Sequence, residues 1–144
     1  MGADLAPALV REGLSTTAMP DVAVDAREAR RLREVSAGAD IGLTGADLAL
    51  AETGTLILRS DAGRPRSTSL LPPCHVAVFD RLALVETLQQ VGVMLEAWHA
   101  TDAVSGVVNF ITGPSRTADI ELTLTRGVHG PKEVHAIFVE GGRA

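Results

Sequence analysis

The sequence predicts an α/β protein with an open, mostly parallel sheet, helices on both faces of that sheet, and one inserted β-hairpin. Two observations predict this fold class. Short apolar runs typical of buried strands alternate with amphipathic segments of helical period. Two further apolar arms flank the turn sequence ETG, which indicates a hairpin. The chain has 144 residues, 46% of them apolar, so it is long enough for one domain with one core.

The first clear element along the chain is a helix over residues 25–38. Residues 1–24 contain two prolines and no sustained hydrophobic period, so we expect a poorly defined N-terminal segment there. Asp25 and Glu28 then form a capping-box pattern, and Gly38 follows the last apolar position. The arginines of this segment indicate a solvated face.

The middle of the chain predicts strands, the hairpin and a second helix. Residues 41–43 indicate a short buried strand, and residues 74–79 another. Between them lies the hairpin, whose loop needs a positive φ at Gly54. In the segment 80–98, apolar residues recur at helical intervals, namely Leu84, Leu88, Val91 and Leu95.

The last third of the chain predicts strands at residues 106–111 and 133–140, with an ambiguous segment between them. Residues 120–125 alternate apolar and polar side chains, which favours a strand. Gly113-Pro114 before this segment and Gly127 after it are typical of the two ends of a helix. We expect a short helix over residues 115–126.

Composition excludes several classes of function. The net charge of −5 argues against a nucleic-acid surface, because phosphate binding requires clustered cations. A single cysteine, Cys74, excludes an internal disulfide and an iron–sulfur cluster held by this chain alone. No stretch approaches the roughly 20 apolar residues of a membrane span, and no secretory signal is visible, so we expect a cytoplasmic protein. No His or Cys pair has metal-ligand spacing, so we assign no metal.

Polar residues after strand ends are the candidates for chemistry, because loops meet at the carboxyl edge of a parallel sheet. The loop Thr112–Thr117 either binds an anion through helix N–H groups and Arg116, or only caps a helix with Asp119 near its start. Asp47 and Glu52 are either an acid–base pair or a nucleophile, or simply turn residues. We expect both carboxylates and the loop to line one shared cleft. His129 lies on a tight glycine-flanked loop and is a further candidate, whereas His75 lies inside an apolar strand and is more typical of a core.

Three blocks of sequence, AETGT, GPSRTADIE and GVHGP, closely resemble the lactate-utilization protein C family, also called the LUD domain. The resemblance runs from about Asp40 to Glu140. It implies a Rossmann-like sheet related to sugar-phosphate isomerases and CoA transferases, and it favours a helix at residues 115–126. The TGAD block is similar to the loop aspartate of the isomerases, and AETGT to the nucleophile loop of the transferases. The resemblance implies catalytic roles for Glu52, Asp47 and His129. The ligand-binding residues that it implies are Thr53, Gly54, Thr55, Thr112, Gly113, Pro114, Ser115, Arg116, Thr117, Asp119 and Gly130.

The same resemblance implies a function. The family is implicated in oxidising L-lactate to pyruvate beside iron–sulfur partners, which implies that iron–sulfur clusters lie in partner proteins and that this chain binds a small organic acid or a phosphate- or CoA-type ligand. Alternatives are a stand-alone acyl-CoA or sugar-phosphate enzyme using Glu52 or Asp47, and a structural adaptor. Residues 25–144 are expected to form one LUD-type domain. Members are usually longer at the N-terminus, so this sequence is expected either to lack strands before Asp25 or to lack residues within 1–24.

Overall fold

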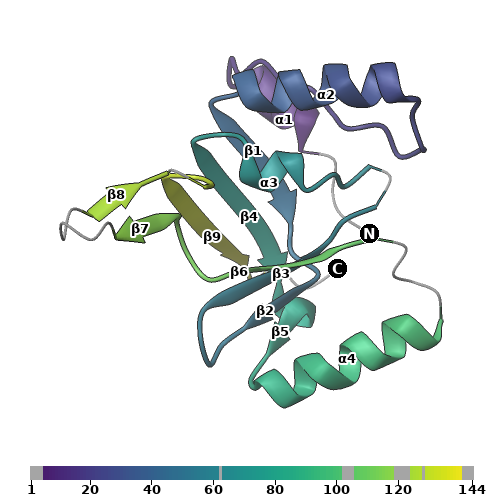
Figure 1. Ribbon diagram of the computed structural model, residues 1–144, viewed down its shortest axis with the longest axis vertical. Helices are drawn as coiled ribbons and strands as arrows, with labels where there is room; N and C mark the ends of the chain where they lie inside the picture. The colour runs from purple at the N-terminus through teal and green to yellow at the C-terminus, as the bar shows by residue number, and fades with distance from the viewer. Residues whose placement is uncertain (1–4, 62, 102–105, 119–123, 128, 141–144) are drawn as a thin grey trace.

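The computed structural model describes residues 5–61, 63–101, 106–118, 124–127 and 129–140. It confirms the α/β class, with a parallel sheet, a second mixed sheet and a separate two-stranded hairpin (Figure 1). The helices are α1 (Ala6–Arg11), α2 (Ala26–Gly38), α3 (Ser67–Leu70), the 3-10 helix η1 (Arg81–Ala83) and α4 (Leu88–Ala100). The strands are β1 (Ile41–Gly45), β2 (Leu48–Leu50), β3 (Thr55–Arg59), β4 (Cys74–Asp80), β5 (Leu84–Val85), β6 (Val108–Ile111), β7 (Arg116–Ala118), β8 (Leu124–Arg126) and β9 (Glu133–Val139).

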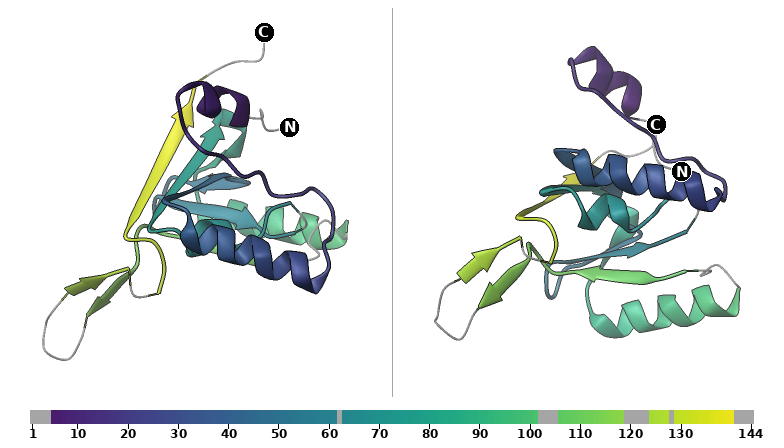
Figure 2. Two further views of the ribbon diagram at one scale, coloured as in Figure 1. Left: turned by 90° about the horizontal axis from the view of Figure 1, so that it is seen from above. Right: turned by 45° about the horizontal axis from the view of Figure 1, so that its top comes forward.

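Helix α2 forms where its capping signal predicts it. The Asp25 carboxylate accepts a hydrogen bond from the Glu28 N–H at 2.8 Å, which satisfies one free donor of the first turn. The Glu28 side chain pairs with Arg31 on the solvated face, at 2.7 Å. In the N-terminal segment, α1 contributes no buried residue, and the right-hand view of Figure 2 shows it standing apart from the sheets.

Strands β1, β4 and β9 form the parallel sheet, in that order. Helix α3 lies against β1 so closely that a Cβ atom at Gly42 would be 1.8 Å from the carbonyl oxygen of Thr68. Glycine is therefore required at that position of β1. Helix α2 lies over α3 on the same side of the sheet (Figure 1).

The second sheet has the order β5-β2-β3-β6. Strands β2 and β3 form the predicted hairpin, joined by residues 51–54, and Gly54 has the positive φ that the turn requires, at 66°. Strand β6 pairs antiparallel with β3, and β5 pairs parallel with β2. The end of β6 is thereby brought beside the hairpin turn.

Both faces of the hairpin strands β2 and β3 are buried, and the side chains alternate between them as strand geometry requires. One face packs against α4 in a cluster with fully buried Ile57. The other face packs against the parallel sheet through Leu56, Leu58 and the buried Ala77 of β4. The hairpin strands therefore lie at the centre of the molecule.

Helix α4 begins later than the apolar spacing predicts. Thr87 and Gln90 form a reciprocal capping box, so Leu88 is the first helical residue. Leu84, expected in the helix, lies in β5 instead. The face that packs on the sheet is formed by Val91, Leu95 and Trp98, whereas Leu88 is exposed.

The prediction of a helix over residues 115–126 is wrong. Arg116–Ala118 and Leu124–Arg126 pair as the antiparallel hairpin β7–β8, with residues 119–123 outside the described part of the chain. Gly113 and Gly127 have positive φ, at 99° and 79°, and flank the hairpin rather than a helix. Of the alternating residues 120–125, those that the structure describes, 124 and 125, lie in β8, and glycine is typical of turns as well as of helix ends.

Candidate functional site

A pocket of about 450 Å³ lies where the β2–β3 turn, the start of α4 and the end of β6 meet. Three elements far apart in sequence build it, and the β3–β6 register aligns Leu56 with Ile111, so Thr112 lies next to the start of β3. The residues that line the pocket are Leu50, Glu52, Thr53, Thr55, Leu88, Gln89, Phe110 and Thr112.

A row of threonine hydroxyls crosses this pocket from the turn to β6. The hydroxyl oxygens of Thr53 and Thr55 are 2.6 Å apart, and those of Thr55 and Thr112 are 2.8 Å apart. Thr55 is buried, whereas Thr53 and Thr112 are exposed. Since a hydroxyl both donates and accepts, the row can present a donor or an acceptor to a bound ligand by rotating its hydrogens.

Glu52 lies at the N-terminus of α4, where helix N–H groups carry partial positive charge. Its Oε2 atom accepts a hydrogen bond from the Leu88 N–H at 3.1 Å. Its own N–H donates to the Glu86 carbonyl at 3.2 Å, which holds the turn against the entry to the helix. The carboxylate is therefore positioned by backbone on both sides while remaining exposed to the pocket.

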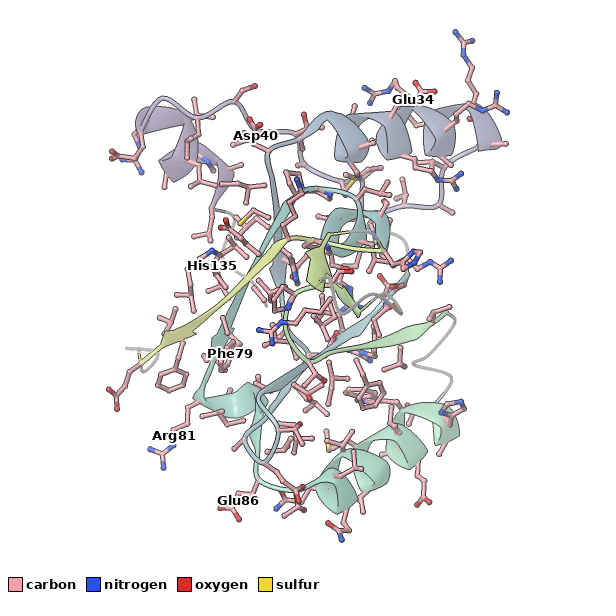
Figure 3. All side chains as sticks on the ribbon, turned by 60° about the vertical axis from the view of Figure 1, so that its left-hand side comes forward. Glu34, Asp40, Phe79, Arg81, Glu86 and His135 are labelled. Atoms are coloured by element: carbon pink, nitrogen blue, oxygen red, sulfur yellow. The ribbon has the colours of Figure 1, made fainter. Side chains whose placement is uncertain are left out.

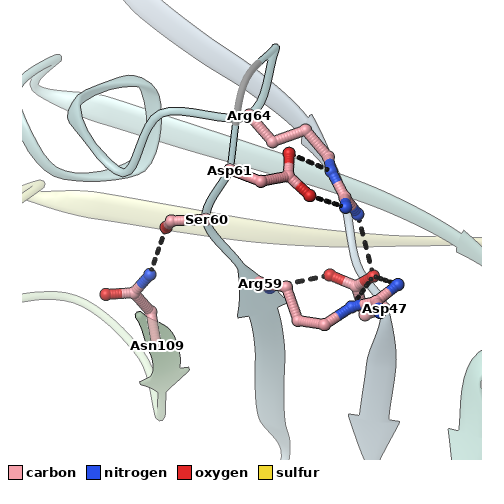
Figure 4. Close-up of polar contacts among 6 residues, drawn as sticks. All are labelled: Asp47, Arg59, Ser60, Asp61, Arg64 and Asn109. Carbon is pink, nitrogen blue, oxygen red and sulfur yellow. Dashed lines mark hydrogen bonds and ion pairs between the residues drawn. The ribbon is translucent and has the colours of Figure 1, made fainter. Parts of the chain in front are cut away.

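Asp47 does not line this pocket, so the prediction of one shared cleft is not met for this residue. Its carboxylate accepts hydrogen bonds from the backbone and side chain of Arg59, at 2.7 and 2.9 Å, and from Arg64 at 2.9 Å (Figure 4). Arg64 also pairs with Asp61, and the Arg59 guanidinium stacks on Trp98 at 4.4 Å. This environment gives Asp47 a structural role, tying β2 to the end of β3.

The segment 112–117 extends away from the pocket after Thr112. Ser115 joins it to the loop that precedes β9, because the Ser115 N–H donates to the Pro131 carbonyl at 2.9 Å and the His129 N–H donates to the Ser115 hydroxyl at 3.2 Å. Gly130 approaches Ser115 closely enough that an added Cβ would lie 3.6 Å from the serine Cβ. His129 and Arg116 are exposed.

No helix begins at this loop, so the predicted cradle of helix N–H groups is absent from its described residues. Of the predicted site residues, the pocket brings together Glu52, Thr53, Thr55 and Thr112, with Gly54 in the same turn. Gly113 and Pro114 carry the chain away toward β7, where the backbone of Thr117 pairs with Thr125. Asp119 lies outside the described residues.

Sequence reasoning missed Gln89 and Phe110, which line the pocket beside the threonines. The capping sequence at Thr87 was the available signal for Gln89, because it fixes which residues lie in the first turn of α4. Phe110 carries no local signal, since the apolar run 106–111 predicts a buried strand, whereas the Phe110 side chain is half exposed.

Two titratable groups with shifted pKa values lie outside the pocket, on β4. Burial lowers the pKa of His75, whose Nε2 atom lies 2.9 Å from the Thr44 hydroxyl. Burial and the nearby Glu133 carboxylate raise the pKa of the Cys74 thiol. Neither group therefore belongs to the chemistry of the pocket at the start of α4, which we call the α4 pocket.

Comparison with known proteins decides the family. The profile of the LUD domain matches residues 2–139, nearly the whole chain. The chain belongs to the LUD domain family. Similar relatives include a lactate utilization protein C from Halalkalibacterium halodurans, 44% identical over 117 residues, and one from Shouchella clausii, 39% identical over 116 residues. Both alignments cover 81% of the chain but only 51% of the relative, so the chain spans about half the length of each.

A solved structure has a similar fold. The crystal structure of a DUF162 family protein from Deinococcus radiodurans superposes with a TM-score of 0.57, covering 93% of this chain and 82% of that one at 23% sequence identity. That likeness supports the fold. Among the helices of the described residues, none combines the length and the apolar character needed to cross a membrane.

Proposed function

We propose that this LUD domain serves lactate utilization. The observation that carries the proposal is the 44% identity, over most of the chain, to a protein named for that process. Because the chain spans half of that relative, the role is proposed for the domain as a contributor rather than as a complete lactate-oxidising enzyme. Its single cysteine agrees with this, since an iron–sulfur cluster needs several protein ligands. The electron-carrying clusters are then those of iron–sulfur partner proteins.

We infer that the α4 pocket is where the domain binds its ligand, a small organic acid. The threonine row and Gln89 offer hydrogen bonds to a carboxylate and a hydroxyl or keto group, and Leu50, Leu88 and Phe110 offer apolar contact to a methyl group. The N-terminus of α4 offsets part of the negative charge of Glu52, whose carboxylate accepts the Leu88 N–H. The lining contains one carboxylate and no lysine, arginine or histidine, which disfavours a multiply charged phosphate over a singly charged acid.

Binding to the purified chain tests the pocket. L-lactate and pyruvate should each shift the melting temperature upward, and inorganic phosphate should not. Thr112→Val removes one hydroxyl from the row and should weaken acid binding by about 1.5–3 kcal/mol, the scale of a hydrogen bond to a charged group. The matched control is Thr101→Val, because Thr101 ends α4 away from the pocket. Equal lactate affinity of the two variants would contradict the site.

A genetic experiment tests the role separately from the site. Deleting the gene in its host should abolish growth on L-lactate as sole carbon source and leave growth on glucose unchanged. Complementation with the Thr101→Val gene should restore growth, and complementation with the Thr112→Val gene should restore it poorly. Normal growth of the deletion strain on lactate would overturn the proposed role.

A stand-alone acyl transferase is the second candidate, and the exposed Glu52 carboxylate on its rigid turn is the observation that favours it. In that mechanism Glu52 attacks the thioester carbonyl, an acyl-glutamyl anhydride forms, and CoA thiolate leaves. Incubation with acetyl-CoA followed by hydroxylamine should then mark Glu52 as a hydroxamate in mass spectra. An unmodified Glu52 in the absence of partners favours the accessory role instead.

A further inference from the structure

Three side chains of types that bind metals meet on the parallel sheet, away from the α4 pocket. The Sγ atom of Cys74 and one ligand atom each from Glu133 and His135 all lie within 4.8 Å of one another. Cys74 is the first residue of β4, Glu133 is the first residue of β9, and His135 lies two residues further along β9. Figure 3 shows His135 on β9, on the edge of the sheet.

The strand register explains why these side chains share a face. Successive side chains of a strand point to opposite faces, so Glu133 and His135 project from the same side of β9. Cys74 is the register partner of Glu133 in the parallel β4–β9 ladder, and paired residues also project to the same side. The cluster is therefore set by backbone pairing and does not depend on a flexible loop.

The cluster is open to solvent and is not saturated by its own contacts. The side chains of His135 and Glu133 are 56% and 68% exposed, and Cys74 is partly buried. The His135 Nε2 atom lies 3.4 Å from the Glu133 carboxylate, which is long for a hydrogen bond between such groups. An incoming cation can therefore displace this contact at small cost.

We propose that Cys74, Glu133 and His135 form a binding site for a zinc-type divalent cation. Thiolate, imidazole and carboxylate are the donors that Zn²⁺ takes in proteins, whereas Mg²⁺ and Ca²⁺ prefer oxygen ligands throughout. At zinc bond lengths the ligand atoms of a tetrahedral site lie roughly 3.3–3.8 Å apart. The contact between His135 and Glu133 already has this length, at 3.4 Å, and a pair at the 4.8 Å limit would need to close by about 1 Å. Three protein ligands leave the fourth position to water.

Such an ion would link the edge strand β9 to the central strand β4. The sequence gives no motif for the site because two ligands are separated by one residue and the third comes from a distant strand. Conventional zinc spacings place ligands on one turn or helix, and a site made by strand pairing carries no such signature.

Cobalt titration of the full chain, stripped of metal with a chelator and kept reduced, tests the site. Co²⁺ should bind at one ion per chain and produce a thiolate-to-cobalt charge-transfer band in the near ultraviolet, and Zn²⁺ should displace it. Cys74→Ser should abolish the band. Glu133→Gln and His135→Asn should each weaken cobalt binding at least about tenfold, since loss of a residue that only hydrogen-bonds to a metal ligand already costs about 10- to 100-fold.

A matched control separates this site from surface binding by any histidine. His99 is exposed on α4, so His99→Asn should leave the cobalt titration unchanged. Zn²⁺ should also raise the melting temperature of the wild-type chain and of the control, and not that of Cys74→Ser. Absence of a thiolate band, or a band with unchanged affinity in Glu133→Gln and His135→Asn, would overturn the proposal.

Discussion

His75 is fully buried in β4, and the environment of its ring makes protonation unfavourable. Its Nε2 atom contacts Thr44, while Nδ1 has no partner among the described residues. Protonation would therefore place a positive charge in the core, on a ring with one nitrogen that has no partner to share it. Burial accordingly holds the pKa of His75 below its ordinary value of about 6.5.

The lowered pKa of His75 predicts acid destabilisation. Below about pH 6.5 the unfolded chain binds a proton that the folded chain does not, so the free energy of unfolding should fall as the pH drops from 7 toward the folded-state pKa. Urea unfolding across this range measures the slope. His75→Gln cannot titrate there and should show a shallower slope. Identical slopes for both proteins would assign the acid sensitivity to other groups.

Asp47 provides the second prediction at the level of single residues. Asp47→Asn keeps the shape of the side chain but weakens charge-assisted hydrogen bonds to Arg59 and Arg64, so unfolding should become easier by about 1.5–3 kcal/mol. Asp61→Asn affects a more exposed pair and should cost at most about 1 kcal/mol. Lactate binding should survive in Asp47→Asn, since Asp47 does not line the pocket. If a folded Asp47→Asn protein lost lactate binding, Asp47 would belong to the ligand site after all.

At the scale of elements, the contact between α3 and β1 depends on a missing side chain. Gly42→Ala would drive a methyl group into the Thr68 carbonyl, forcing α3 away from the sheet, and should cost at least about 1–3 kcal/mol. Gly45→Ala in the same strand meets only an ordinary contact, 3.9 Å from the Val78 oxygen, and serves as the control. Chemical denaturation of the two variants measures the difference. Equal stability of the two variants would mean that α3 can shift to accommodate the added methyl group at no cost.

Elements with local signals could be predicted, and those fixed by tertiary contacts could not. The cap at Asp25 and the turn at Gly54 act within a few residues, and the structure confirms both. The pairing of β7 with β8 was not predicted, because glycine and proline are typical of helix ends and turns alike. The start of α4 was misplaced because apolar spacing cannot distinguish the first helical turn from the strand β5 before it.

The candidate site was predictable only in part for the same reason. Glu52 and Thr112 were both chosen as residues following strands, and the β3–β6 register brings their segments to one pocket. Asp47 fits the same rule in sequence but lies at the other end of β2, where two arginines engage it. Because β3 pairs antiparallel with both β2 and β6, the end of β2, the start of β3 and the end of β6 lie at one edge of the sheet. The sequence pattern does not show how the strands pair, so it does not show which strand ends meet at the pocket.

At the scale of the whole molecule, the second sheet joins two hydrophobic clusters. Its β3 strand lies between α4 and the parallel sheet (Figure 1). Ile57 packs in the cluster on the α4 side and Leu56 in the cluster on the side of the parallel sheet, so the same backbone supports both. Neither cluster can lose this strand without exposing the other. We therefore expect the two halves to unfold together, as most single domains of this size do.

This coupling gives the last prediction. Ile57→Ala and Leu56→Ala each remove a buried side chain and should each cost about 2–5 kcal/mol, while the exposed Val93→Ala should be near neutral. Trp98, the sole tryptophan, reports on the α4 cluster, and far-ultraviolet circular dichroism reports on the whole chain. Both probes should show one coincident urea transition. In each variant, the midpoints from the two probes should shift by the same amount. If Leu56→Ala moved the dichroism transition but left Trp98 fluorescence in place, the two clusters would be separate folding units, and the sheet between them would not transmit stability.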